Sequence, residues 1–213
     1  MDLENKIFKG TTTIGIVCKE GLVLAADKRA TAGYEVASRE MEKVFPITES
    51  IVITVAGLVS DAQLISKLIK AEISLKRYRT DKESSVKEVA NLLATIVYAN
   101  IRKMSMVPGI VGFLIGGKDS SGYKLFEIGI DGSVTEDKKF ISTGSGSSYA
   151  LGVLEAQYKD GVTIEEGVKL AVRALNAALQ RNVATGEGID VYSVTEKGAK
   201  KVLAKTIDYR IQV

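Results

Sequence analysis

Histidine is absent from this 213-residue chain, and cysteine occurs once, as Cys18. Without imidazole, a Ser-His-Asp or Cys-His mechanism is excluded, as is a zinc site built on histidine. A single cysteine excludes an internal disulfide and a CxxC metal knuckle. Cys18 lies in an apolar run, so we interpret it as a buried thiol that packs as a small hydrophobe. An enzyme with this composition must draw its chemistry from Thr, Ser, Lys, Asp or Glu.

The sequence also lacks a strong charge bias and any long apolar segment. Its formal net charge is +3, and no Lys/Arg run is interleaved with aromatic residues, so nucleic acid is not an expected partner. Its longest apolar stretches, such as IVGFLIGG, are far shorter than the ~20 residues of a membrane helix. The first ten residues include Asp2 and Glu4 and no apolar h-region, unlike a secretory signal. We therefore expect no membrane contact and a cytoplasmic location.

Runs rich in β-branched residues and bounded by turn residues predict strands in three groups. Residues 30–42, between the second and third predicted strands, form a polar connection. The predicted strands cover residues 11–19, 21–29, 43–47 and 50–57, then 110–117, 123–130, 133–136 and 139–143, and finally 188–195 and 199–207.

Helices are indicated where apolar residues recur at helical spacing behind a capping residue. Three pairs have capping-box spacing: Ser60 with Gln63, Ser85 with Glu88, and Thr163 with Glu166. The apolar stripes behind them predict helices from about residue 61 through 73, from 86 through 104, and from 164 through 178. The second of these stops at Pro108-Gly109, and residues 147–158 predict a fourth helix after a glycine-rich turn.

The order of these elements predicts the fold class. Strands grouped apart from helices favour α+β over a doubly wound parallel sheet. Two stacked sheets, with a layer of helices on each outer side, would bury the apolar face of every element. No linker, repeat or low-complexity segment interrupts the chain, so we expect a single domain behind a short charged leader, residues 1–10, with the domain covering 11–213.

Two glycine patterns approach nucleotide-binding motifs without their structural context. Residues 112–119, GFLIGGKD, fall one residue short of a P-loop, with Asp119 in place of the magnesium-binding hydroxyl and an apolar strand as the interior. Residues 144–152, GSGSSYALG, carry Tyr149 where a dinucleotide-binding loop needs its third glycine. We interpret the first as a buried strand and the second as a tight turn into a helix.

A serine–lysine hydrolase is the next chemical candidate. The S-x-x-K spacing occurs from Ser84 to Lys87 and from Ser121 to Lys124. No partner motif such as S-D-N or K-T-G accompanies either one. A helix cap explains the first spacing, and a polar turn explains the second.

The stretch KGTTTIG favours a nucleophile at a chain end. A free α-amine has a reference pKa of about 7.7–8.0, so an amino-terminal threonine can serve as its own general base without histidine. Cleavage after Gly10 would create that terminus at Thr11. Glycine suits this position, because it has no Cβ and can adopt the strained turn that self-cleavage demands.

Several motifs, in order, resemble the β subunits of the proteasome, most closely the archaeal ones. They are GTTTIGIVCKEGLVLAADKRAT, EKVFPI, VAGLVSDAQ and STGSGSSYALGVLE, followed by EEGVKLAVRAL. The resemblance runs from Gly10 to about Thr195. It implies the N-terminal-nucleophile hydrolase fold, a four-layer αββα sandwich that agrees with the layers expected from the element order.

The resemblance also implies a catalytic site. It makes Gly10-Thr11 the self-cleavage junction and Thr11 the nucleophile. Asp27 matches the orienting carboxylate, with Arg29 its neighbour, and Lys43 matches the catalytic lysine. Further positions complete the match: Gly57 as the oxyanion donor through its backbone N–H, Ser145 near the Thr11 amine, and Asn182 and Thr185 in the supporting hydrogen-bond network.

For the substrate, the resemblance implies an apolar pocket that suits hydrophobic residues on the acyl side of the scissile bond. Its walls would include Ala30, Met41, Phe45, Val55 and Val59, with the Thr31 backbone binding an extended chain. The implied partners are α subunits and other β subunits in stacked seven-membered rings, with an ATPase regulator that delivers unfolded protein. No metal or organic cofactor is implied.

Position 182 departs from the family pattern, which usually has aspartate there. Asn182 keeps an acceptor oxygen but supplies no negative charge. This motivates one alternative, a β subunit that keeps its leader and serves as a structural partner of an active paralogue. A second alternative is a different N-terminal-nucleophile hydrolase that acts on small amides, or a bacterial-type two-ringed protease.

Overall fold

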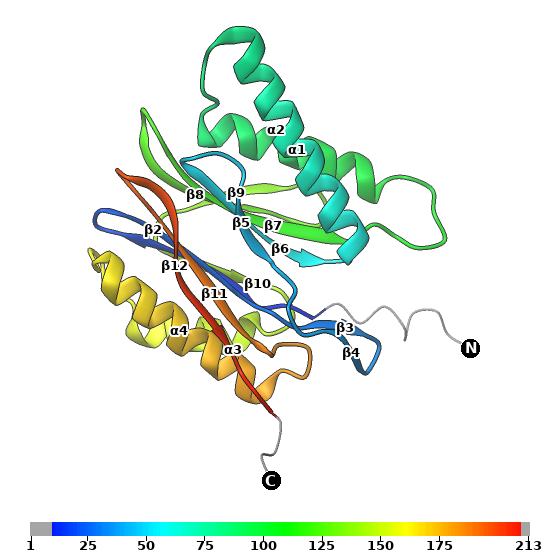
Figure 1. Cartoon of the computed structure of the whole chain (residues 1–213), viewed down its shortest axis with the longest axis vertical. Coiled ribbons are helices and arrows are strands. Elements are labelled where there is room, and N and C mark those ends of the chain that lie inside the picture. Colours follow the sequence, from blue (N-terminus) through cyan, green and yellow to red (C-terminus); the bar gives the residue numbers. More distant parts are fainter. Residues whose placement is uncertain (1–9, 210–213) are drawn as a thin grey trace.

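A computed structural model describes residues 10–209 of the chain. Two five-stranded antiparallel sheets face each other, and a pair of helices covers the outer face of each sheet (Figure 1). This is the four-layer α+β arrangement expected from the element order, and that prediction is confirmed. Of the predicted leader, residues 1–9 lie outside the described part.

The first sheet has the strand order β10-β1-β2-β11-β12 and the second the order β5-β6-β7-β8-β9. A separate hairpin, β3-β4, projects from the end of the sandwich (Figure 1). The strands of the first sheet are β1 (Thr13–Cys18), β2 (Gly21–Asp27), β10 (Phe140–Thr143), β11 (Gly188–Thr195) and β12 (Gly198–Thr206). Those of the second are β5 (Val44–Pro46), β6 (Ile51–Gly57), β7 (Val111–Asp119), β8 (Gly122–Ile128) and β9 (Val134–Asp137).

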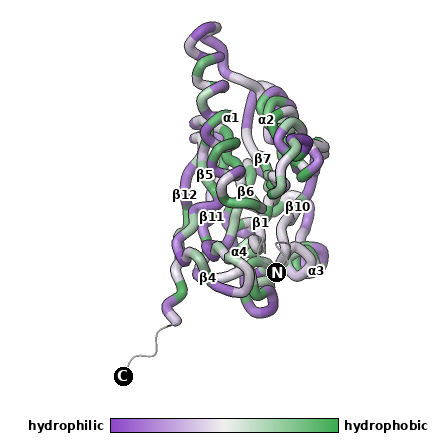
Figure 2. The backbone as a smooth tube through the Cα atoms, turned by 90° about the vertical axis from the view of Figure 1, so that its right-hand side faces the viewer, coloured by the Kyte–Doolittle hydropathy of each residue, from purple (hydrophilic) through white to green (hydrophobic). Residues whose placement is uncertain are grey.

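Helices α1 (Val59–Thr80) and α2 (Val86–Ile101) pack on the second sheet, whereas α3 (Ser147–Gln157) and α4 (Ile164–Arg181) pack on the first. Hydrophobic and hydrophilic positions alternate along α1 and α2, as burial of one side requires (Figure 2). None of the helices within residues 10–209 is both long and apolar enough to cross a membrane.

The apolar core has three parts that correspond to the three interfaces between layers. One part lies between the sheets and includes Leu22, Leu24, Val52 and Leu114, each fully buried. The other two lie between each sheet and its helices. Phe113 and Ile115 alternate with Leu114 along β7 and face α1 and α2, because successive strand residues point to opposite faces. Both sheets are therefore covered on both faces.

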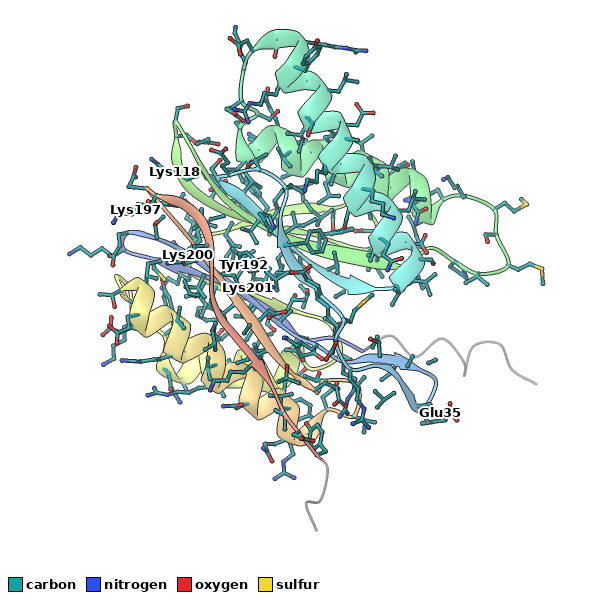
Figure 3. The ribbon with its side chains drawn as sticks, in the orientation of Figure 1. Glu35, Lys118, Tyr192, Lys197, Lys200 and Lys201 are labelled. Atoms are coloured by element: carbon teal, nitrogen blue, oxygen red, sulfur yellow. The ribbon has the colours of Figure 1, made fainter. Side chains whose placement is uncertain are left out.

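The outer edge of the first sheet is β12, an exposed strand rich in lysine. Lys200 and Lys201 lie on it, and Lys197 lies in the turn that precedes it (Figure 3). The Lys201 ammonium is 5.3 Å from the centroid of the Tyr192 ring on the neighbouring strand. Charged lysines on an edge strand oppose uncontrolled pairing with another sheet.

Three local predictions were wrong. Residues 30–42 are not simply a polar connection, because β3 (Ala30–Ala32) and β4 (Glu35–Ser38) pair within them. Ser60 does not cap α1: the N-cap is Leu58, and the Ser60 hydroxyl donates to Asp61 instead. Helix α2 ends at Ile101, before Pro108-Gly109, and Met104 is fully exposed.

The early end of α2 has a local cause. The Asn100 amide in its last turn donates to Asp61 Oδ1 at 2.7 Å and to the Gly109 carbonyl at 3.1 Å. Through Asn100, Gly109 is held close to Asp61 in the first turn of α1, so residues 102–110 fold back toward that helix. The chain therefore leaves the helix, although its apolar pattern continues.

The capping boxes at Ser85 and Thr163 are confirmed, with both reciprocal bonds present in each. We expect Ser85→Ala to lower the free energy of unfolding by about 1 kcal/mol, because it frees the Glu88 amide that the Ser85 hydroxyl caps. Ser60→Ala is the matched control and should change it by less than about 0.5 kcal/mol. Equal losses in urea titrations of the two variants would contradict the cap assignment.

Candidate active site

The site is organised around the carboxylate of Asp27, the last residue of β2. Asp27 is 1% exposed. Its Oδ1 accepts from the Thr12 backbone N–H at 2.9 Å, and its Oδ2 accepts from the backbone N–H groups of Arg29 and Gly186, each at 3.0 Å. Three separate parts of the backbone therefore converge on one carboxyl group, which fixes its position before any substrate binds.

Lys43 supplies the charge that balances Asp27. Its Nζ lies 2.9 Å from Asp27 Oδ1, and its side chain is 4% exposed. Burial lowers the pKa of Lys43 from its ordinary value, whereas the Asp27 charge and hydrogen bond oppose that shift. Because Lys43 immediately precedes β5, the pairing of β5 with β6 holds its ammonium beneath the start of β1.

The Gly10 carbonyl is contacted by two donors. The Thr11 hydroxyl donates to it at 2.6 Å, and the Lys43 ammonium donates to it at 3.4 Å. Both donors withdraw electron density from the carbonyl, so its carbon is polarised beside the Thr11 oxygen. The Thr11 nitrogen is an amide here, because residue 10 precedes it in the chain.

Glycine is required at two positions that touch this junction. A Cβ at Gly10 would lie 1.6 Å from the Cβ of Ala184, so the loop before β11 leaves no room for a side chain there. Gly144 has φ of +92°, and a Cβ on it would lie 2.1 Å from the Thr11 carbonyl oxygen. Both contacts are with parts of the chain far away in sequence, so close packing selects glycine at these positions.

A second set of hydrogen bonds holds Thr12, the residue before β1, to the loop that precedes β11. The hydroxyls of Thr12 and Thr185 are 2.7 Å apart, and the Thr185 hydroxyl donates to Asn182 Oδ1 at 2.8 Å. The Ser145 hydroxyl donates to the same oxygen at 3.0 Å. The resemblance had implied support near the Thr11 nitrogen, but the hydroxyl that Thr185 contacts belongs to Thr12.

Asn182 does more than accept these bonds. Its Nδ2 donates to the Ser145 carbonyl at 3.1 Å, which an ionised aspartate could not do. The side chain thus joins the end of α4 to the turn before α3 by a bond in each direction. The network at this position is complete without a negative charge.

Sequence reasoning missed Thr12 and Glu187. Glu187 is buried with φ of +65°, and its Oε1 accepts from the Arg29 guanidinium at 3.0 and 3.2 Å. Arg29 also donates to the Val183 carbonyl at 2.6 Å, so its side chain ties the loop over residues 182–187 to the end of β2. No spacing in the sequence signals these contacts, because they join residues more than 150 positions apart.

A cavity of about 210 Å³ opens beside Thr11. Of the six predicted pocket residues, five line it: Ala30, Thr31, Met41, Val55 and Val59. Phe45 does not line it: this side chain is partly buried and packs against the core cluster beneath α1 and α2. Gly10, Lys43 and Gly57 complete the wall nearest Thr11, so an apolar pocket leads directly to the polarised carbonyl.

The other chemical candidates are part of the framework. Residues 112–119 lie within β7, as interpreted, and the Asp119 carboxylate caps the Val86 amide. Burial raises the pKa of the Cys18 thiol to about 12, assisted by the charges of Glu20 and Glu166. A neutral thiol is a poor nucleophile, which agrees with the interpretation of Cys18 as a packing residue.

Comparison with known proteins places this geometry in a family. Residues 7–194 match the family model described as "Proteasome subunit". The chain belongs to the proteasome subunit family. It is 44% identical to "Proteasome subunit beta" of Ferroglobus placidus over 92% of this chain and 91% of that protein. It is 45% identical to "Proteasome subunit beta 1" of Thermococcus kodakarensis over 91% of this chain and 92% of that protein. The resemblance read from the motifs is thereby confirmed at the level of the family.

Thr185→Val tests the hydrogen bonds that join Thr12, Thr185 and Asn182. Valine keeps the shape of threonine but leaves the buried Thr12 hydroxyl and the Asn182 oxygen each without one partner, so we expect a loss of about 1–3 kcal/mol in the free energy of unfolding. Thr135→Val, on the exposed strand β9, is the matched control and should be nearly neutral. Equal unfolding midpoints for the two variants would show that these hydrogen bonds do not stabilise the fold.

Proposed function

We propose that this protein is a threonine-type endopeptidase subunit of a 20S proteasome core that degrades unfolded proteins to peptides. The observation that carries the proposal is the Gly10 carbonyl, which accepts from both the Thr11 hydroxyl and the Lys43 ammonium. A hydroxyl and a cation focused on one peptide bond are what cleavage of that bond requires. The family membership supports the same reading.

Activation begins with the chain's own peptide bond. The Thr11 hydroxyl oxygen attacks the Gly10 carbonyl carbon, and Lys43 stabilises the negative charge that develops on the carbonyl oxygen. The C–N bond then breaks, and the Thr11 nitrogen takes up the hydroxyl proton. The product is an ester between Gly10 and the Thr11 oxygen. Water hydrolyses this ester, which releases the leader with a terminal carboxylate and leaves Thr11 with a free α-amine.

The freed amine then serves as general base for substrate cleavage. It accepts the hydroxyl proton through a water molecule while the Thr11 oxygen attacks the substrate carbonyl. Gly57 lines the cavity wall beside Thr11, where its backbone N–H would donate a hydrogen bond to the oxyanion. The substrate's acyl side occupies the apolar cavity, and water later hydrolyses the acyl-enzyme.

Assembly completes the proposal. We infer that the subunit joins α subunits and further β subunits in stacked seven-membered rings and receives unfolded chains through an ATPase regulator. Family membership and the names of the archaeal relatives support assembly with other subunits. Confinement within such a particle would limit cleavage to the chains that the regulator delivers into it.

A second candidate function is a silent subunit that retains its leader beside an active paralogue. The observation that favours it is Asn182, because the neutral amide supplies no negative charge to the hydrogen-bond network that reaches Thr12, the residue after the nucleophile. Asn182 nevertheless makes hydrogen bonds with both Ser145 and Thr185. What favours the silent subunit is therefore the missing negative charge and not a missing hydrogen bond.

The intact mass of the subunit after co-assembly with α subunits separates the two candidates. We expect a chain that begins at Thr11 and gains one covalent adduct from a peptide electrophile, because the hydroxyl and the new amine act together. Thr11→Ala removes the nucleophile and should retain the full-length mass. A full-length wild-type chain without adduct, in particles that contain a processed paralogue, would establish the silent subunit instead.

A further inference from the structure

A second cavity, of about 550 Å³, meets the first at the nucleophile. Both cavities include Thr11 and Gly57 in their walls. One wall of the second is formed by Ser142, Thr143, Gly144 and Ser147, at the end of β10 and the start of α3. The opposite wall follows the end of β8 and the turn into β9, residues 127–131.

The position of Gly10 distinguishes the roles of the two cavities. Gly10 carries the carbonyl that Thr11 attacks, and it lines the first cavity but is not part of the second. The first cavity therefore holds the acyl side of the scissile bond. A substrate that continues past Thr11 must leave on the other side of the nucleophile, where the second cavity lies.

Glu127 gives the second cavity its chemical character. Its side chain is partly buried, and within residues 10–209 its carboxylate makes no hydrogen bond or ion pair. By contrast, the buried carboxylates of Glu187 and Asp190 each lie within 3.3 Å of a cationic side-chain nitrogen, from Arg29 and Lys28 respectively. A partly desolvated carboxylate without a counter-charge is unfavourable by itself.

Asp131 adds a second negative charge to the same wall. Its Oδ1 accepts from the Ser133 backbone and hydroxyl, which lower its pKa and keep it ionised. Burial, together with Asp137 and Asp131, raises the pKa of Glu127. A cation in the cavity would offset each of these unfavourable contributions.

We propose that the second cavity binds the residues on the carboxyl side of the scissile bond and favours a lysine or arginine side chain there, with Glu127 as the specificity-determining residue. The inference rests on the proposed peptidase function and extends it. Combined with the apolar first cavity, it predicts cleavage between an apolar residue and a basic one. The acidic wall disfavours aspartate and glutamate at the same place by like-charge repulsion.

Internally quenched peptides test this in the assembled particle. The peptides share one apolar residue before the scissile bond and carry lysine, norleucine or glutamate after it. We expect kcat/KM for the lysine peptide to exceed that for the glutamate peptide about fivefold, the size of one partly desolvated ion pair. Glu127→Gln should remove most of this ratio, while Glu155→Gln, the same change on exposed α3, should preserve it.

A binding measurement separates this inference from the proposed function. Thr11→Ala particles assembled from a chain that starts at residue 11 carry no leader beside the first cavity and cannot cleave, so fluorescence anisotropy of the same peptides, labelled and unquenched, reports binding alone. Tighter binding of the lysine peptide, lost in Thr11→Ala/Glu127→Gln, supports the subsite even if the wild type cleaves nothing. Equal binding and equal cleavage of the three peptides would overturn the subsite and leave the peptidase function standing.

Discussion

The Asp27 carboxylate is buried at the end of β2, where it accepts three backbone N–H groups and the Lys43 ammonium. A buried charge is tolerated only when it is paired and hydrogen-bonded, so each of these partners is held in place by the need to satisfy the carboxylate. The partners belong to the start of β1, the segment after β2, the loop before β11 and the approach to β5. One side chain therefore sets the relative positions of the segments that make up the site.

The sandwich supplies these segments because strand ends from both sheets meet at one end of the molecule. Thr11 precedes β1 of the first sheet, whereas Lys43 and Gly57 flank β5 and β6 of the second. The core between the sheets fixes their separation, and Gly10 and Gly144 allow the backbones to approach more closely than a Cβ would permit. The same convergence leaves an apolar cavity on one side of Thr11 and an acidic one on the other.

Features that depend on local chemistry could be predicted from the sequence. The capping boxes at Ser85 and Thr163 formed because hydroxyl and carboxylate lie three residues apart on one chain. Ser60 has the same spacing but no cap, because α1 begins at Val59 and so includes Ser60. The β3-β4 hairpin was missed, since its strands are short and mostly exposed and carry no clear apolar pattern.

Within the site, motif matching supplied residue identities but not their contacts. It gave Thr11, Asp27 and Lys43, which the structure brings together, and Phe45, which packs against the core beneath α1 and α2 and does not line the cavity. It did not give the Thr12–Thr185 bond, the Arg29–Glu187 pair or the placement of Glu127 in the cavity that reaches Thr11. Each of these joins distant parts of the chain through tertiary packing, for which sequence spacing carries no signal.

The rate of leader removal in Asp27→Asn particles tests the central role of this carboxylate most directly. Asparagine keeps the shape but removes the charge, so Lys43 becomes a buried cation without a counter-charge. Its ammonium is then no longer held in place beside the Gly10 carbonyl. In particles that assemble as the wild type does, we predict that time-resolved intact mass shows the full-length chain persisting while the wild type is processed. Processing of Asp27→Asn at the wild-type rate would contradict the account.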